Sequence, residues 1–204
     1  MFISLSARYV GYACAITQGK INYLEKGETH FFDWLICSLK SVNEVLEGKA
    51  IDFEDDYIYP NNLDTVSINF KNFDLLTSHH DIYKFNENSI LDITEKYNRR
   101  RLRLLETIKS EKLIKFIRYC KNAKDVEEEQ IDKFYENIIA IDPTLEFHFL
   151  LVSDNKDIVI TETLLSKKNF KYINLLDYAD EDTTMEKNDY FKIIKSYKCI
   201  YLHF

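Results

Sequence analysis

Strand-like and helix-like segments alternate in the second half of this chain, and that alternation limits the possible folds more than any other feature. Continuous apolar runs at 113–120, 146–154 and 171–178 are typical of buried strands. Between the first two runs, residues 125–141 have helical spacing and begin with carboxylates, which favour a helix N-terminus. Such alternation with short links is typical of a mixed or mainly parallel sheet flanked by helices, so we predict an α/β fold.

The first half of the chain has a less regular pattern. A buried strand is expected at 2–5, and residues 65–70 alternate with period two, so that they could form a hairpin with the segment that follows. Helical spacing predicts helices at 38–47 and 94–110. The second helix is expected to have Thr94 as its N-cap. Its expected apolar face comprises Tyr97, Leu102, Leu105 and Ile108.

The length and composition of the chain fit one folded domain. Its 204 residues are 46% hydrophobic and include 14 Tyr and 14 Phe, which is enough to bury a substantial core. We expect a single α/β domain over residues 1–204, with a motif-bearing half at 1–112 and the alternating half at 113–204. The segments 52–62 and 179–188 are the expected surface loops.

Charge, hydropathy and cysteine usage exclude several classes of protein. The net charge of −7 argues against a broad nucleic-acid surface, because binding to phosphates needs clustered cations. No signal peptide is expected, and no apolar run approaches the roughly 20 residues of a membrane span. The four cysteines form no CxxC pair, so we expect reduced thiols and a cytoplasmic protein without a cofactor. Frequent Lys, Ile, Asn and Tyr suggest an AT-rich genome, and a viral protein would lie in the host cytoplasm or the virion.

One cysteine differs from the others in its local sequence. Cys14 follows a short strand and a glycine in the order Gly11-Tyr12-Ala13-Cys14. Free backbone N–H groups and the helix dipole at a strand-to-helix turn favour a thiolate and can also hold an oxyanion. Cys14 is therefore the candidate nucleophile, with a packed or merely surface thiol as the alternative. The remaining cysteines are expected to be small buried side chains: Cys37, Cys120 and Cys199.

A histidine pair and an aspartate, His79-His80-Asp81, end an apolar strand. A histidine there can act as general base for a thiol, and a carboxylate can orient its ring. Asp81 is not expected to orient its neighbour His80, because adjacent strand residues point to opposite faces. The alternative is one exposed histidine beside one that caps the strand end. No metal site is expected, since the other histidines show no ligand spacing: His30, His148 and His203.

A carboxylate lies inside an aromatic segment, Phe31-Phe32-Asp33-Trp34, beside the only Trp of the chain. A carboxylate in such surroundings is either buried and hydrogen-bonded or part of a functional site. Two roles are therefore open for Asp33. It either caps the following segment or is the third member of a Cys–His–Asp arrangement.

A run of arginines, RRRLR at 99–103, places Arg99 and Arg103 on one face of the expected helix. Such a face could bind phosphate or a nucleic-acid backbone. The shortness of the run and the acidity of the chain favour a solvated face instead. Ion pairing with the carboxylates of residues 52–56 is a further use.

Taken in order, these motifs resemble a family of papain-like cysteine peptidases found in bacteria and in some large DNA viruses. The shared elements are Gly11-x-x-Cys14, the aromatic Phe32-Asp33-Trp34, the pair His80-Asp81, the arginine-bearing helix from Tyr97 to Leu105, and the strand Phe116-Ile117-Arg118-Tyr119. The resemblance covers roughly residues 2–120.

The resemblance implies that Cys14 is the nucleophile and His80 the base, with Asp33 or Asp81 orienting the histidine. The chain would then be a cysteine-nucleophile hydrolase or acyl transferase acting on a protein or another acyl substrate. The alternation after residue 113 is not typical of a papain fold, but a site can be carried on a different scaffold. The alternative hypothesis is a non-catalytic α/β interaction protein, viral or bacterial, in which the site is degenerate.

Overall fold

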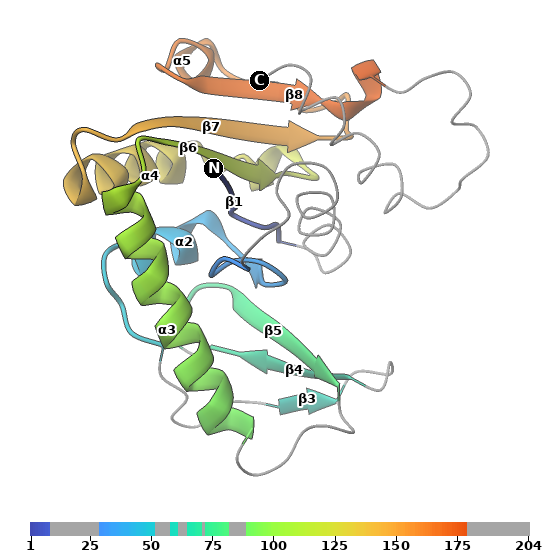
Figure 1. Cartoon of the computed structure of the whole chain (residues 1–204). Helices are drawn as coiled ribbons and strands as arrows, with labels where there is room; N and C mark the ends of the chain where they lie inside the picture. The colour runs from blue at the N-terminus through green and yellow to red at the C-terminus, as the bar shows by residue number, and fades with distance from the viewer. Residues whose placement is uncertain (9–28, 52–57, 61–64, 71, 82–88, 179–204) are drawn as a thin grey trace.

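Two four-stranded sheets organise the protein in a computed structural model of the chain (Figure 1). The structure describes residues 1–8, 29–51, 58–60, 65–70, 72–81 and 89–178. The first sheet is parallel, with the strand order β1-β6-β7-β8. Its strands are β1 (Phe2–Ser4), β6 (Leu113–Tyr119), β7 (Glu146–Ser153) and β8 (Phe170–Asn174). The predicted α/β fold is thus confirmed.

The second sheet is small and antiparallel, with the order β2-β5-β4-β3. Its strands are β2 (Ile36–Cys37), β5 (Leu76–Asp81), β4 (Thr65–Asn69) and β3 (Ile58–Pro60). The predicted hairpin is confirmed by β4 and β5, which pair from Thr65↔Asp81 to Asn69↔Thr77. The expected surface loop at 52–62 is wrong for the residues of β3. This strand lies at the edge of the sheet, where the missing N–H of Pro60 is tolerated.

Helices follow the strands after residue 113 much as the alternation predicted. The described helices are α2 (Leu39–Leu46), α3 (Ser89–Ser110), α4 (Glu128–Ile141) and α5 (Glu162–Leu165), with 3-10 turns η3 (Ala123–Asp125) and η4 (Leu175–Tyr178). Figure 1 shows α4 along one face of the parallel sheet and α3 running beside the antiparallel sheet. The predicted strand at 171–178 is only half correct, because β8 ends at Asn174 and the chain continues as η4.

The helix α2 begins and ends at the residues that its sequence favours. Ser38 is the N-cap, and its hydroxyl accepts a hydrogen bond from the N–H of Ser41 at 3.1 Å. Gly48 has a φ of +94°, and its N–H donates to the carbonyl of Val45 at 3.1 Å. A glycine takes this left-handed conformation without strain, so the helix ends there.

The buried face of α3 differs from the predicted one. The helix begins at Ser89, so Thr94 is not an N-cap; its hydroxyl donates to the carbonyl of Ile90 at 2.8 Å inside the helix. Leu102 is 53% exposed, which contradicts its expected place in the core. The buried residues of α3 are Ile93, Tyr97, Leu104 and Ile108. These positions recur at four, seven and four residues, which keeps them on one side of a helix with 3.6 residues per turn.

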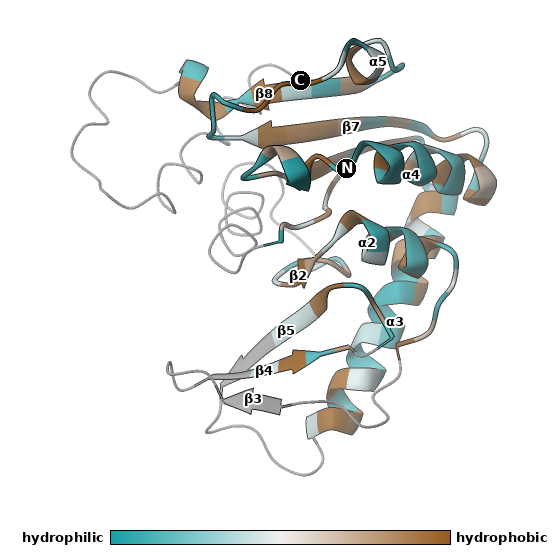
Figure 2. Ribbon diagram, turned by 180° about the vertical axis from the view of Figure 1, so that it is seen from behind, coloured by the Kyte–Doolittle hydropathy of each residue, from teal (hydrophilic) through white to brown (hydrophobic). Residues whose placement is uncertain are grey.

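The core extends from one sheet to the other. Phe134 of α4 packs edge-on against Phe116 of β6 and Phe149 of β7, at centroid distances of 5.0 and 5.2 Å. Hydrophobic residues make up much of β7 in Figure 2, whereas hydrophobic and hydrophilic residues alternate along α4. A parallel bridge between Ala7 and Ile36 joins the end of β1 to β2 and thus links the two sheets. Within the described ranges, no helix is long and apolar enough to cross a membrane.

Candidate functional site

The segment after β1 brings the chain to the junction of the two sheets. Ser6 has a φ of 59°, and its hydroxyl donates to the carbonyl of Leu35, just after the aromatic motif. One residue later, the carbonyl of Ala7 accepts a hydrogen bond from the N–H of Cys37 at 2.9 Å. The described chain then reaches Arg8 and resumes at Thr29. Hydrogen bonds therefore hold the segment after β1, which leads toward the candidate nucleophile, against the segment that carries Asp33.

Asp33 is fully buried and closes a tight turn. Its Oδ2 accepts a hydrogen bond from the backbone N–H of His30 at 2.7 Å, and its own N–H donates to the carbonyl of His30 at 3.3 Å. The next residue, Trp34, has a φ of 68°, which redirects the chain into β2. Asp33 therefore has a structural role in its own turn, where its carboxylate accepts from a residue that precedes it and not from the following segment that it was expected to cap.

The turn of Asp33 lies against α3, and β2, which follows the turn, pairs with β5. The ring of Tyr97 packs edge-on against Phe31 and Phe70, at centroid distances of 5.8 and 5.6 Å. Burial raises the pKa of Tyr97 to about 12; the hydrogen bond with Ser78 acts in the opposite direction and the nearby Asp33 carboxylate in the same direction. Tyr97 therefore packs against the segment that carries Asp33.

The histidine pair and Asp81 lie in β5 as the sequence predicted. In the backbone register, His79 pairs with Ser67, His80 with Val66 and Asp81 with Thr65. The structure describes only the backbone at these three positions of β5. His80 is two positions beyond Ser78, and positions two apart in a strand share a face.

The candidate nucleophile Cys14 lies outside the described residues, as does Cys199. The two described cysteines are buried and free, as expected for packing residues. Burial raises the pKa of Cys37 to about 11 and that of Cys120 to about 12. Both are therefore protonated thiols at neutral pH, and neither has the low pKa of a reactive cysteine.

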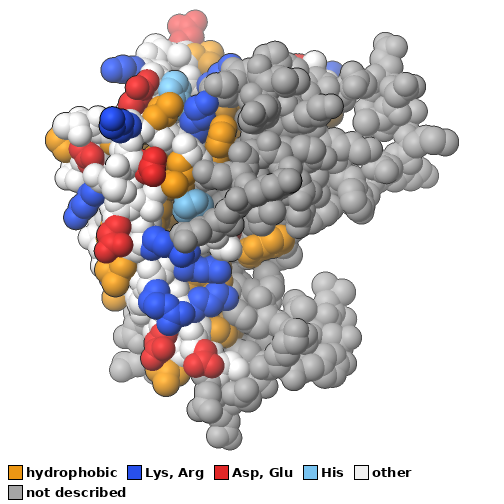
Figure 3. Space-filling view, viewed as in Figure 1, with side chains coloured by type: hydrophobic (Ala, Val, Ile, Leu, Met, Phe, Trp, Pro, Cys, Tyr) orange, Lys and Arg blue, Asp and Glu red, His pale blue; other side chains and the backbone are white. Residues whose placement is uncertain are grey.

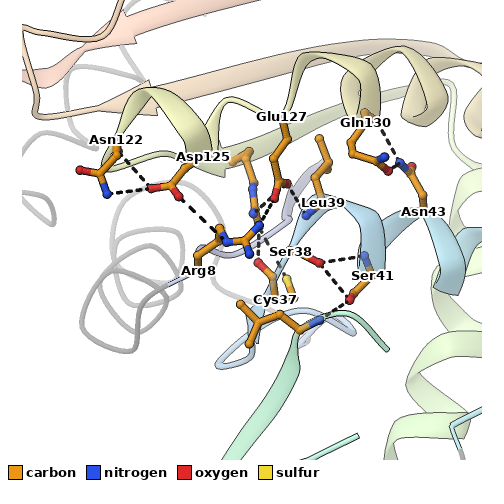
Figure 4. Close-up of polar contacts among 12 residues, drawn as sticks. Arg8, Cys37, Ser38, Leu39, Ser41, Asn43, Asn122, Asp125, Glu127 and Gln130 are labelled. Carbon is orange, nitrogen blue, oxygen red and sulfur yellow. Dashed lines mark hydrogen bonds and ion pairs between the residues drawn. The ribbon is translucent and has the colours of Figure 1, made fainter. Parts of the chain in front are cut away.

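A buried charge network lies at the carboxyl ends of β1 and β6 and was not foreseen from the sequence (Figure 4). Arg118 is 1% exposed, and its Nη1 donates to the carbonyls of Leu5 and Cys37, each at 2.9 Å. Its Nη2 lies 3.6 Å from Oε2 of Glu127. One signal was available: a charged residue inside the apolar strand LIKFIRY has to find a buried partner.

Glu127 connects this network to two further segments. Its Oε2 accepts a hydrogen bond from the N–H of Leu39 at 2.6 Å, at the start of α2, and its Oε1 accepts one from Nη1 of Arg8. Nε of Arg8 also lies 4.0 Å from Oδ1 of Asp125, whose Oδ2 accepts the N–H of Asn122 at 3.0 Å. Two arginines and two carboxylates thus lie together at the sheet edge.

The arginine run of α3 is used in part for contacts within the protein. Nη1 of Arg101 donates to the carbonyl of Gly48 at 3.0 Å, and Nη2 of Arg103 donates to the carbonyl of Thr29. The guanidinium of Arg100 lies 5.6 Å from the centre of the Tyr97 ring. Lys and Arg side chains gather over α3 in Figure 3. The carboxylates of residues 52–56 lie outside the described ranges.

Metal-ligating clusters and surface grooves were also compared with the position of this site in the described parts of the chain. In the parts of the chain that the structure describes, no group of three or more His, Cys, Asp or Glu could hold a metal ion. A groove of about 560 Å³ is lined by residues that include Tyr135, Pro143, Phe147 and Lys168. It lies where β7 begins, whereas Arg118 lies near the opposite, carboxyl end of the parallel strands.

Comparison with known proteins gives one match. A sequence profile of the family described as "Putative papain-like cysteine peptidase (DUF1796)" matches residues 9–157, which include the candidate Cys14, Asp33 and His80. No curated protein and no solved structure matches the chain. The family match covers most of the chain and includes the motifs from Gly11 to Tyr119. The chain belongs to this family of papain-like cysteine peptidases.

Proposed function

We propose that the protein is a cysteine hydrolase or acyl transferase in which Cys14 is the nucleophile, His80 the general base and Asp33 the carboxylate that orients the base. Membership of a family described as papain-like cysteine peptidases supports the reaction class. The proposal assigns no metal or cofactor to the reaction, because a Cys–His–Asp arrangement performs acyl transfer with its own side chains.

The backbone arrangement that brings the Asp33 turn beside β5 is the observation that carries the proposal. Asp33 is fully buried, and β2, which follows its turn, pairs with β5 at Ile36↔Thr77 and Cys37↔Leu76. His80 is three positions beyond Thr77 in the same strand. A buried carboxylate at this place favours the imidazolium form of the base during the reaction.

Asp33 fits the orienting role better than Asp81 does. Asp81 directly follows His80 in the strand, and neighbouring positions of a strand face opposite sides. The same alternation separates His79 from His80, so that only one of the two histidines can share the face of Ser78. His80 is therefore the proposed base and His79 its natural control.

The proposed reaction is an acyl transfer in two steps. His80 takes the proton of the Cys14 thiol, and the thiolate attacks the acyl carbon, while backbone N–H groups near Cys14 stabilise the oxyanion. The C–N or C–O bond to the leaving group breaks, the leaving group takes the proton from His80, and a thioester remains on Cys14. Water, or an acceptor amine or alcohol, then attacks the thioester, gives its proton to His80 and releases the acyl group, and the thiol is restored.

Alkylation of the four cysteines tests the proposal directly. The folded protein is treated with iodoacetamide at pH 7, and each cysteine is followed by peptide mapping. We expect Cys14 to react faster than free cysteine, while Cys37 and Cys120 stay unmodified because they are buried. A second probe, p-nitrophenyl acetate, is expected to leave an acetyl group on Cys14 and on no other cysteine.

Paired variants identify the base. His80→Gln is expected to slow the alkylation of Cys14, whereas His79→Gln leaves it unchanged, with circular dichroism showing that both variants are folded. Cys14→Ala is expected to abolish acetylation by p-nitrophenyl acetate. If Cys14 reacts no faster than free cysteine and His80→Gln changes nothing, the proposal is wrong and the non-catalytic alternative is favoured.

A further inference from the structure

The side chain of Glu127 contacts three separate segments that meet at the junction of the two sheets (Figure 4). One carboxylate oxygen binds the guanidinium of Arg8, at the point where the described chain leaves β1. The other accepts the N–H of Leu39 at 2.6 Å and lies 3.6 Å from Nη2 of Arg118. Leu39 follows the Asp33 turn and the short strand β2. A single carboxylate thus contacts both the segment that follows β1 and the segment that carries Asp33.

The network around Glu127 is buried and balanced in charge. The side chains of Glu127 and Asp125 are 9% and 2% exposed, and those of Arg118 and Arg8 are 1% and 33% exposed. Two cations therefore face two carboxylates in a region of low dielectric constant, where the loss of one partner leaves an uncompensated charge. Such contacts favour one arrangement of their members, because a buried charge that moves away from its partner is left uncompensated.

The backbone at Glu127 adds an independent sign of a specific role. Glu127 has a φ of 52° and a ψ of 51°, a left-handed conformation that side chains other than Gly, Asn and Asp seldom adopt. It directly precedes α4, which begins at Glu128. A residue held in such a conformation is strained and persists only where its surroundings require it. Here the conformation accompanies the contacts of the carboxylate with Arg8 and Leu39.

We propose that Glu127, held by Arg118, is a positioning residue that fixes the exit of β1 at Arg8 against the segment that carries Asp33. This inference rests on the proposed function, because the chain that leaves Arg8 leads to Cys14, and Asp33 belongs to the half of the site that carries His80. Glu127 touches no substrate in this role. It acts through Arg8 on one side and through the start of α2 on the other.

The variant Glu127→Gln tests the proposal, with Glu47→Gln as its matched control. The amide that replaces the Glu127 carboxylate would keep an oxygen for the N–H of Leu39 and lose the charge that holds Arg8 and Arg118. Glu47 also loses a charge in its variant, and it too joins α2 to α4, through a half-exposed contact of 3.2 Å with Lys133. Because Glu127→Gln could unfold the protein, Arg8→Met serves as a second variant, with Lys133→Met as its control.

Two measurements are made on each folded variant. The first is the pH dependence of Cys14 alkylation by iodoacetamide. We expect Glu127→Gln and Arg8→Met to raise the midpoint of this profile toward that of a free thiol, which slows alkylation about tenfold at neutral pH for each unit of rise. The second is amide hydrogen exchange, which we expect to accelerate at residues 1–8 and 29–39 and nowhere else. Both controls should match the wild type.

In Glu127→Gln, the direction of the midpoint shift separates positioning from a simple field effect. Arg8→Met removes a positive charge, which would raise the midpoint in either case, so the amide exchange decides for that variant. Removing a negative charge near a thiol lowers its pKa, so a lower midpoint in Glu127→Gln would mean that Glu127 acts by its charge alone and would overturn the proposal. An unchanged midpoint together with unchanged exchange would also overturn it. If wild-type Cys14 reacts no faster than free cysteine, the proposed function fails instead. The exchange at residues 1–8 and 29–39 then decides by itself whether Glu127 holds these two segments together.

Discussion

Nη1 of Arg118 lies 2.9 Å from the carbonyl oxygen of Cys37, and through this hydrogen bond a strand of the parallel sheet holds the end of the antiparallel one. The same nitrogen binds the carbonyl of Leu5 at 2.9 Å, so that the guanidinium bridges the segment after β1 and the end of β2. The first of these leads along the chain toward Cys14, and the second follows the turn that carries Asp33. The buried arginine therefore holds together two segments that adjoin candidate site residues in the sequence.

Replacing this arginine is expected to destabilise the protein strongly. Arg118→Met leaves Glu127 without its buried cation and removes a donor from the carbonyls of Leu5 and Cys37, so we expect the free energy of unfolding to fall by about 3–5 kcal/mol. Urea unfolding followed by circular dichroism measures the change. Lys133→Met removes a half-exposed ion pair with Glu47 and should cost less than about 1 kcal/mol. Equal losses in the two variants would contradict the importance that we assign to Arg118.

Two neighbouring leucines of α3 test which face of the helix is buried. Leu104 is 1% exposed, and Leu104→Ala is expected to lower the free energy of unfolding by about 2–5 kcal/mol through the cavity that it leaves. Leu102 is 53% exposed, and Leu102→Ala should change it by less than about 0.5 kcal/mol. Thermal and urea unfolding of both variants check this difference. A larger loss of unfolding free energy in Leu102→Ala than in Leu104→Ala would instead support the buried face that was expected from the sequence.

Asp33 has two roles that a pair of substitutions can separate. Asp33→Ala removes the acceptor of the buried N–H of His30 and should cost about 1–3 kcal/mol of unfolding free energy. Asp33→Asn keeps an oxygen for that N–H, so its loss of stability should be smaller, but the variant lacks the negative charge that would orient the base. We therefore expect slow alkylation of Cys14 in a well-folded Asp33→Asn protein. If Cys14 is alkylated at the wild-type rate in that variant, Asp33 has only its structural role in the turn.

The buried thiols make the stability of the protein depend on pH in the alkaline range. Burial raises the pKa of Cys37 from 9.0 to about 11, so this thiol ionises in the unfolded chain before it does in the folded one. Its contribution is complete below pH 9.0 and is lost as the pH rises from there toward about 11. We expect Cys37→Ser, whose hydroxyl can still donate to Leu5, to lose less stability over this range. Unfolding by urea at several pH values measures the two slopes, and identical slopes would argue against a raised pKa of Cys37.

The sequence predicted most elements of the fold because their signals are local. The apolar runs at 113–120 and 146–154 form β6 and β7, and the alternation at 65–70 forms β4. The predicted face of α3 was wrong at Leu102, because a leucine signals burial by its type, whereas the partner elements decide which side of the helix is covered. The strand at 58–60 was missed because Pro60 and its acidic surroundings are typical of a loop.

The candidate site was also predictable from local sequence only in part. Local motifs were enough to single out Cys14, Asp33 and His80 and to recognise the family that the profile match then identified. The buried network of Arg118 and Glu127 could not be found in this way. These two residues are nine positions apart in the sequence, and Glu127 lies in an acidic run that is typical of a solvated helix start.

What the sequence determined by itself is therefore the type of most elements and the family, since propensity, hydrophobic period and motif order are properties of short segments. Only the tertiary structure decided which charges are buried, which face of α3 is covered, and that the segment of Asp33 packs against α3. These features arise from contacts between segments far apart in the chain. Their free energies depend on desolvation and on partners, and neither is encoded by any one segment.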